Sequence, residues 1–263
     1  MGTSLLQLPN IAIRFHVKHA AANLENKDAE VVQDTMAEKA MFHVKHTAPT
    51  NLLLAGGRSP ALAWLEAASK LASYDVYCAD KGVATALAAG FKPKLVVGDC
   101  DSGSKADYER AQGLGAAIAI HPTAKDDTDL QLLLAQLAGD TLVVSGIWGG
   151  RFDHLLSNVY SLLAFKNKHR CQVLLADEQE LMLLLCSGEA VTLELSALEA
   201  VQALSLLPLS ANTTVSLKGV QWPLENASVT QQYPYAISNV PVNSEVECSC
   251  SDGCLGLYIH WQS

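Results

Sequence analysis

Short apolar runs alternate with helical patterns from residue 51 to residue 177, and this alternation constrains the fold more than any other feature of the chain. One of the helical patterns places Leu130, Leu133, Leu134 and Leu137 on one face. Strands that alternate with helices predict βαβ units around a parallel sheet, an α/β domain. The strands are expected at 51–55, 75–79, 94–97, 116–120, 141–145 and 171–176.

The pattern changes near residue 178. Short apolar segments such as 181–185 and 190–195 are separated by Ser, Gly, Asn and Pro, and no helical period is sustained. Such segments predict a small antiparallel β-sandwich domain over 178–263. The expected fold class is therefore α/β, with an N-terminal parallel-sheet nucleotide-binding domain over 51–177 followed by the sandwich.

Residues 1–50 are predicted to be a poorly ordered or atypical extension outside the core. They contain a short repeat, Phe-His-Val-Lys-His, which begins at Phe15 and again at Phe42. A His-x2-His pair that occurs twice is also compatible with a metal site, and Met41 is a candidate for the true start.

Composition limits the class of protein. Hydrophobic residues make up 49% and charged residues 17%, as in a globular chain with a sizeable core. The net charge of −9 argues against nucleic acid as a partner. No apolar run is long enough to span a membrane, and no signal peptide is seen. Seven cysteines, an odd number, favour reduced thiols and a cytoplasmic location, although Cys248, Cys250 and Cys254 cluster.

Two carboxylates follow the predicted strand 94–97. Asp99 and Asp101 are two residues apart, so on an extended chain they point the same way. Like charges held together repel unless a cation lies between them, which makes the pair a candidate metal site. The alternative is a polar turn in which Asp101 or Ser102 caps the next helix.

Further polar residues also follow strands. In an open α/β sheet, ligands bind outside the carboxyl ends of the strands. Carboxylates without nearby His or Cys suit Mg²⁺, which usually completes its shell with water and phosphate oxygens, so a nucleoside triphosphate is the expected ligand. The residues expected on this common rim are Asp80, Asp99, Asp101, Asp126, Asp129 and Arg151.

Two segments on the rim have both a functional and a structural interpretation. Asp126-x-Thr128-Asp129 opens a helix, where it either meets metal and phosphate or forms an ordinary N-cap. Gly149-Gly150-Arg151 offers close backbone approach and a forked contact to phosphate, or a tight turn with a surface Arg. His154 contacts nucleotide or makes a structural hydrogen bond. The chain has no Walker A sequence, and Gly56-Gly57-Arg58 is too short to count as one.

Together these motifs resemble the thiamine pyrophosphokinase family. The resemblance rests on Asp80 with Gly82, Gly98-Asp99-x-Asp101-Ser102, Asp126-x-Thr128-Asp129 and Gly149-Gly150-Arg151-x-Asp153-His154, in this order and spacing. A weaker C-terminal part consists of Gly219-x-x-Trp222-x-Leu224 and Ser238-Asn239, so that the resemblance covers about 51–261.

The resemblance implies an activity and roles for residues. It implies Mg²⁺-dependent transfer of pyrophosphate from ATP to the hydroxyl of thiamine, giving thiamine diphosphate and AMP, by a homodimer with thiamine sites at its interface. The implied catalytic residues are Asp99, Asp101, Asp126 and Asp129, of which Asp99, Asp101 and Asp126 bind the metal. The implied nucleotide contacts are Asp80, Thr128, Gly149, Gly150, Arg151, Asp153 and His154, and the implied thiamine contacts are Trp222, Ser238 and Asn239.

Some features depart from the family or allow another interpretation. Lys81 stands where the family usually has Gly, and Cys100 where Phe is common. Trp222 is either a cation-binding indole or a core aromatic residue of the β domain. The alternative functions are a non-catalytic module that binds nucleotide or thiamine, and a related pyrophosphokinase that uses another alcohol.

Overall fold

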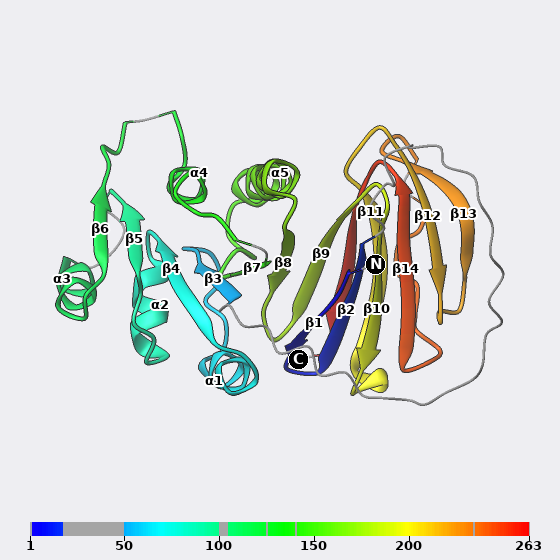
Figure 1. The fold of residues 1–263 in the computed structure, drawn as a ribbon, viewed down its shortest axis with the longest axis horizontal. Coiled ribbons are helices and arrows are strands. Elements are labelled where there is room, and N and C mark those ends of the chain that lie inside the picture. The colour runs from blue at the N-terminus through cyan, green and yellow to red at the C-terminus, as the bar shows by residue number, and fades with distance from the viewer. Residues whose placement is uncertain are drawn as a thin grey trace, which may run out of the picture.

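The computed structural model describes residues 2–17, 50–99, 105–124, 126–139, 141–233 and 235–262. Over residues 50–176 it contains the predicted alternation of strands and helices (Figure 1). In chain order the elements are β3 (Thr50–Leu54), α1 (Leu62–Leu71), β4 (Tyr74–Ala79), α2 (Gly82–Ala88), β5 (Leu95–Gly98), α3 (Lys105–Gly113), β6 (Ala117–Ile120), α4 (Asp129–Leu134), β7 (Thr141–Ser145), α5 (Phe152–His169) and β8 (Gln172–Ala176).

Six of these strands form the parallel sheet that the sequence predicts. Their order is β8-β7-β3-β4-β5-β6, and every neighbouring pair is parallel. Because all six run in the same direction, their carboxyl ends lie along one edge. The loops that follow β3, β4, β5 and β7 therefore meet at that edge.

Helices cover both faces of this sheet. Helices α1, α2 and α3 lie on one face, and α4 and α5 lie on the other (Figure 1). Alternate residues of each strand serve the two faces, so Leu52 and Leu54 pack in one hydrophobic cluster and Leu53 in the other. Burial on both faces explains why these strands read as continuous apolar runs.

The sheet continues past the expected domain boundary. Strand β9 (Glu180–Cys186) pairs antiparallel with β8, and β15 (Cys254–Trp261) and β11 (Val201–Pro208) extend the same sheet to nine strands. The expected boundary at 177/178 therefore falls in the turn between two paired strands, and three strands of the C-terminal part belong to the first sheet.

A second, six-stranded antiparallel sheet packs against that extension and completes the predicted sandwich. Its order is β1-β2-β10-β14-β12-β13. The strands are β1 (Gly2–Leu8), β2 (Ile11–Val17), β10 (Glu189–Leu195), β12 (Asn212–Lys218), β13 (Leu224–Thr230) and β14 (Glu245–Asp252), with a short 3₁₀ helix at Leu198–Ala200.

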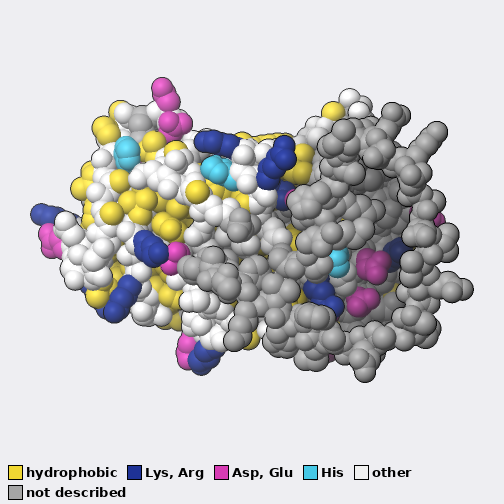
Figure 2. Space-filling view, in the orientation of Figure 1, with side chains coloured by type: hydrophobic (Ala, Val, Ile, Leu, Met, Phe, Trp, Pro, Cys, Tyr) yellow, Lys and Arg dark blue, Asp and Glu magenta, His cyan; other side chains and the backbone are white. Residues whose placement is uncertain are grey.

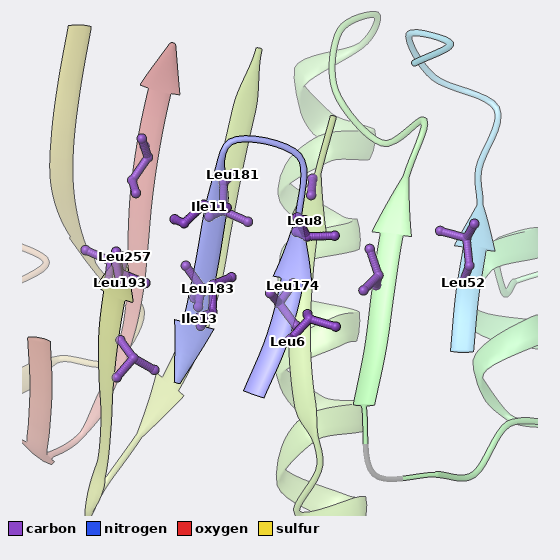
Figure 3. Packing of buried hydrophobic residues seen from close by; sticks show 14 of the residues in the cluster. Leu6, Leu8, Ile11, Ile13, Leu52, Leu174, Leu181, Leu183, Leu193 and Leu257 are labelled. Carbon is purple, nitrogen blue, oxygen red and sulfur yellow. The ribbon is translucent and has the colours of Figure 1, made fainter. Parts of the chain in front are cut away.

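The N-terminal residues are part of this core, so the expectation of a loose extension is wrong for residues 2–17. Strands β1 and β2 form a hairpin, and β2 pairs with β10. Leu6, Leu8, Ile11, Ile13 and Phe15 are buried, and the labelled side chains of the hairpin point among those of β9, β10 and β15 (Figure 3).

The signal for this hairpin was the alternation of apolar residues on either side of Pro9-Asn10, where Asn10 has a φ of 70°. His16, in the first copy of the repeat, accepts or donates a hydrogen bond with the Thr192 hydroxyl at 3.0 Å. Its companion His19, the second copy and Met41 lie outside the described residues, so the hypotheses about them stay predictions.

Two observations concern the membrane proteins and nucleic-acid binders that the composition disfavours. None of the helices in the described ranges is long and apolar enough to cross a membrane. On the face shown in Figure 2, the Lys and Arg side chains of the described residues lie apart from one another instead of forming one basic surface.

Candidate functional site

A cavity of about 470 Å³ lies at the carboxyl edge of the parallel strands. Its walls come from the loops after β3, β4, β5 and β7, and from the starts of α4 and α5. This is the position at which open α/β sheets bind ligands. Its polar and glycine residues are Gly56, Gly57, Asp80, Lys81, Asp99, Thr123, Asp127, Thr128, Asp129, Gly146, Gly149, Gly150, Arg151, His154 and Asn158.

The cavity brings together most of the residues predicted for the nucleotide. Eight of them line it: Asp80, Asp99, Thr128, Asp129, Gly149, Gly150, Arg151 and His154. Asp126 and Asp153 are exposed and do not line it, whereas Asp127, which was not predicted, does. Asp101 lies outside the described residues, so its role stays a prediction.

Four aspartates, termed the acidic wall, are among the residues that line the cavity. Asp80 follows β4 with a φ of 51°, a conformation that Asp tolerates better than most residues, and its backbone N–H donates to the Val97 carbonyl at 2.8 Å. A Cβ added at Gly56 would lie 3.1 Å from the Asp80 Oδ2, so the carboxylate faces the loop after β3. Asp99, Asp127 and Asp129 complete the wall. Such a concentration of negative charge favours a bound cation.

The donor chemistry of this wall fits Mg²⁺. Carboxylate oxygens are its preferred ligands, and it is usually held by one or two carboxylates together with water and phosphate. Across the described ranges, no three His, Cys, Asp or Glu side chains form a group that could hold a metal by themselves.

The start of α4 forms a capping box, so the structural interpretation of Thr128 is confirmed. Its Oγ1 accepts from the Gln131 backbone N–H at 3.3 Å, and the Gln131 Oε1 accepts from the Thr128 N–H at 2.8 Å. The cap holds the first turn in place, with Thr128 and Asp129 at the cavity.

The loop after β7 needs glycine at three positions. Gly146, Gly149 and Gly150 have φ values of 70°, 71° and 70°, which side chains rarely adopt. Arg151 then makes an exposed fork with Asp153, in which its Nε donates to Oδ1 at 3.1 Å and its second terminal nitrogen donates to Oδ2. Their hydrogen bond lowers the pKa of Asp153. The remaining guanidinium N–H groups stay available to a ligand.

The loop after β3 contains Gly56-Gly57-Arg58, whose glycines line the cavity although the sequence did not predict them as site residues. The Gly57 N–H donates to the Gly146 carbonyl at 2.7 Å, and the Arg58 N–H donates to the Trp148 carbonyl at 2.6 Å. The two glycine loops therefore brace each other across the cavity floor. A Cβ at Gly57 would lie 2.7 Å from two of these carbonyl oxygens, which explains the glycine.

Arg58 anchors that loop to the turn between β8 and β9. Its guanidinium donates to Asp177 at 2.6 Å and to Glu180 at 3.0 Å, and the Asp177 side chain is fully buried. Burial alone would lower the pKa of Arg58, but the hydrogen bonds that it donates to both carboxylates outweigh burial, and the pKa is raised. No local pattern marks this pair, because its members are 119 residues apart.

The three residues predicted to bind thiamine lie together, away from the cavity walls. The Trp222 N–H donates to the Asn239 Oδ1 at 3.2 Å, and the Asn239 Nδ2 donates back to the Trp222 carbonyl at 2.8 Å. Ser238 has a φ of 60°, and its N–H donates to the Ser205 Oγ at 3.0 Å. Asn239 is buried, and its side-chain amide hydrogen-bonds to the backbone of Trp222, so its role is to hold the loop that carries Trp222.

The alternative that Trp222 is a core residue is wrong, since 58% of it is exposed. Tyr233, Tyr235 and Ile237 are also exposed in the same stretch of chain. An indole held on a braced loop with its face open to solvent is suited to a flat, cationic ligand.

Comparisons with known proteins agree with this geometry. Two family models match: "Thiamin pyrophosphokinase, catalytic domain" over residues 69–175 and "Thiamin pyrophosphokinase, vitamin B1 binding domain" over residues 191–255. The thiamine pyrophosphokinase of Bacillus subtilis is 31% identical over 180 residues, which cover 67% of this chain and 82% of the relative. Thiamine pyrophosphokinase 1 of Oryza sativa is 30% identical over 163 residues, which cover 57% of this chain and 60% of the relative.

Solved structures extend the likeness to the fold. The crystal structure of the Bacillus subtilis enzyme aligns with a TM-score of 0.69 and 27% identity, covering 81% of this chain and 99% of that one. The thiamin pyrophosphokinase of Geobacillus thermodenitrificans aligns with a TM-score of 0.67 and 25% identity, covering 81% and 98%. The yeast structure, at 16% identity and a TM-score of 0.66, covers 94% of this chain and supports the fold alone.

Proposed function

This chain belongs to the thiamine pyrophosphokinase family, and on that premise we propose that it transfers the pyrophosphoryl group of ATP to the hydroxyl of thiamine, giving thiamine diphosphate and AMP. The observation that carries the proposal is the cavity at the carboxyl edge, where carboxylates, two glycine loops and two cationic side chains converge. These are the groups that a metal-bound triphosphate requires.

ATP would lie with its phosphates along the two glycine loops. The backbone there has no side chains to keep a phosphate at a distance, and Arg151 and Lys81 supply positive charge. Magnesium would be held by the aspartates that the family resemblance implies, Asp99, Asp101 and Asp126, and when bound it would neutralise phosphate charge. Of the four implied catalytic aspartates, Asp99 and Asp129 line the cavity.

The reaction is a displacement at the β-phosphorus. The thiamine hydroxyl oxygen forms a bond to that phosphorus, the bond to the oxygen bridging the α- and β-phosphorus breaks, and AMP leaves. A carboxylate of the acidic wall accepts the proton of the hydroxyl. The chain's contribution is mainly position and electrostatics, because the braced glycine loops and Arg151 hold the phosphates in line with the attacking oxygen.

Thiamine would bind at Trp222, whose exposed indole face attracts its cationic ring by about 0.5–2 kcal/mol. Because Trp222 does not line the cavity, the two substrates must be brought together. We propose that a homodimer does this, with the Trp222 loop of one copy facing the cavity of the other. Sedimentation of the purified chain tests the dimer, and a monomeric, fully active chain would contradict it.

The decisive experiment is turnover. Purified full-length chain with thiamine, ATP and Mg²⁺ should release AMP and thiamine diphosphate in equal amounts. A well-folded chain that binds ATP or thiamine without releasing AMP would instead be a binding module. AMP release only with a different alcohol would identify another pyrophosphokinase.

A matched pair of variants tests the acidic wall. Asp99→Asn should lower turnover by on the order of 100-fold or more, since even a residue that only supports a metal ligand typically accounts for 10–100-fold. Asp252→Asn, an exposed aspartate on β14 far from the cavity lining, should leave turnover unchanged. Equal turnover in both variants would reject the assignment of Asp99.

We also propose that the enzyme works in the cytoplasm, because seven scattered cysteines, an odd number, favour reduced thiols. Fractionation of cells expressing the tagged chain tests this proposal.

A further inference from the structure

Two half-buried thiols lie against each other at one edge of the nine-stranded sheet, where the chain passes to and from the six-stranded sheet. Cys186 ends β9 and Cys254 begins β15, and the two residues are direct partners in the antiparallel register. Their sulfur atoms are 3.2 Å apart. Direct partners on antiparallel strands have Cβ atoms close to the separation that a disulfide requires, so a bond needs only a small movement. The two thiols are 68 residues apart in the sequence.

The backbone holds both thiols in this position. The Cys186 N–H donates to the Glu189 Oε2 at 2.7 Å, and the other oxygen of Glu189 accepts from the buried Lys166 Nζ at 2.8 Å. The Cys254 N–H donates to the Ser210 Oγ at 2.9 Å. Each cysteine is anchored from its own side of the strand pair, and the two sulfur atoms therefore face each other.

The other cysteines of the described ranges are less accessible. Cys78, Cys171, Cys248 and Cys250 are buried. The thiol of Cys250 donates to the carbonyls of Asp252 and Gly253, and burial raises its pKa to about 12. The clustered spacing of Cys248, Cys250 and Cys254 therefore separates into two buried thiols and one that meets Cys186.

We propose that Cys186 and Cys254 are an oxidisable pair that closes to an intramolecular disulfide by exchange with a small-molecule disulfide such as oxidised glutathione. The Cys254 thiolate attacks one sulfur of glutathione disulfide and releases one glutathione. The Cys186 thiolate then attacks the Cys254 sulfur, forms the protein disulfide and releases the second glutathione. Two protein thiols are oxidised, one small disulfide is reduced, and the two thiol protons pass to the released thiols.

The order of the two steps follows from the surroundings of Cys186. The Cys186 thiol donates to the Asn167 Oδ1 at 3.2 Å, and this hydrogen bond engages its proton while Cys254 makes the first attack. Burial first, and then the adjacent Cys254 sulfur, also raise the pKa of Cys186. The second attack is intramolecular, and the mixed disulfide then holds its sulfur beside Cys186.

The bond would close residues 187–253 into one covalent loop. That loop contains strands β10 to β14 and nearly all of the vitamin B1 binding match at 191–255. A cross-link restricts the unfolded chain, and more so for a long loop, so the oxidised protein should unfold at a higher urea concentration. The cavity at the carboxyl edge contains neither cysteine and should keep its ligand affinity.

Peptide mapping of the unmodified sequence tests the bond directly. The folded, full-length chain is incubated with oxidised glutathione, free thiols are alkylated, and the digest is analysed by mass spectrometry. We expect one cross-linked peptide pair containing Cys186 and Cys254, and an intact mass lower by two hydrogen atoms. Alkylated Cys186 and Cys254, a persistent glutathione adduct or a bond from Cys254 to Cys250 would each overturn the proposal.

Serine variants test the consequence for stability. Oxidation should raise the urea midpoint of the wild-type chain and of Cys250→Ser, but not that of Cys254→Ser or Cys186→Ser. The same rise in Cys254→Ser would overturn the proposal. If Cys250→Ser does not fold, peptide mapping of the wild-type chain still decides the identity of the bond.

Discussion

The chain contains the sequence Gly-Gly-Arg twice, at 56–58 and at 149–151, and the two copies have different surroundings. Both follow a parallel strand, and both glycine pairs line the cavity. Arg58 turns away from the cavity to Asp177 and Glu180, where it joins the parallel sheet to β9. Arg151 stays at the cavity, and among the described residues its ion pair is with Asp153, two residues along the chain.

The role of a Gly-Gly-Arg segment therefore depends on which residues the fold brings within reach of its arginine. A guanidinium that meets a fully buried carboxylate serves as a brace, because that carboxylate would otherwise be uncompensated. A guanidinium whose partner is exposed keeps donors for a ligand. The predictions below test whether the two loops differ in this way.

Removing the brace should have the largest effect. Arg58→Met leaves the Asp177 carboxylate buried without its cation, and we expect the free energy of unfolding to fall by about 3 kcal/mol, the low end for breaking a buried pair because 30% of the Arg58 side chain is exposed. Urea denaturation measures this loss. Arg14→Met, whose partner Glu194 is also exposed, should cost at most about 1 kcal/mol. Equal losses would show that Arg58 is not a brace.

Alanine substitutions of the loop glycines should have the next largest effect, and the loss of stability should differ between the two loops. In Gly57→Ala the new Cβ meets the Gly146 and Trp148 carbonyl oxygens at 2.7 Å, so the loop must move. We expect this movement to lower the free energy of unfolding by about 1–3 kcal/mol. In Gly150→Ala no atom lies within 4 Å of the new Cβ. Its free energy of unfolding should fall only because of the φ of 70°, by about 1 kcal/mol. Urea denaturation of both variants gives the comparison. A larger loss for Gly150→Ala would contradict the bracing of the two loops.

Replacing Arg151 should weaken ATP binding without changing the free energy of unfolding. Arg151→Met should raise the KM for ATP about tenfold, since a hydrogen bond to a charged group contributes about 1.5–3 kcal/mol and part of it is replaced by water. Its unfolding should be unchanged because its ion pair is exposed. Arg151→Lys keeps the positive charge but not the forked guanidinium. Its KM for ATP should lie between those of the wild-type chain and Arg151→Met. An unchanged KM would remove Arg151 from the nucleotide site.

Lys81 should have the smallest effect. It lines the cavity where the family usually has Gly, and its side chain is exposed. Lys81→Gly should raise the KM for ATP about threefold, from the 0.2–1 kcal/mol of an exposed charge pair. Lys92→Gly, on an exposed loop outside the cavity lining, is the matched control. A lower KM in Lys81→Gly would mean that the lysine crowds the site.

Much of the parallel half could be predicted because its signals are local. Apolar runs such as 141–145 coincide with β7, and the helical spacing of Leu130, Leu133 and Leu134 lies in α4. Polar residues that follow parallel strands must meet at one edge, so the residues of that edge could be grouped from sequence alone. Asp80, Asp99 and Arg151 do line one cavity.

The sandwich half was harder to predict. Its strands are short, and β2 finds its partner β10 more than 170 residues later in the chain. The hairpin of residues 2–17 therefore resembled a loose terminus, although its apolar residues alternate. The sheet also continued across 177, because an antiparallel strand can extend a parallel sheet after a short turn.

Local sequence was enough to predict the alternation of strands and helices, the edge at which polar loops gather and the family to which the chain belongs. Apolar spacing and residue type carry that information locally. Three features could be seen only in the folded chain: which Gly-Gly-Arg is the brace, that Cys254 faces Cys186, and that the first strands complete the sandwich. Each of these depends on a hydrogen bond, ion pair or sulfur contact between residues far apart in the chain, and such partners exist only once the sheets have formed.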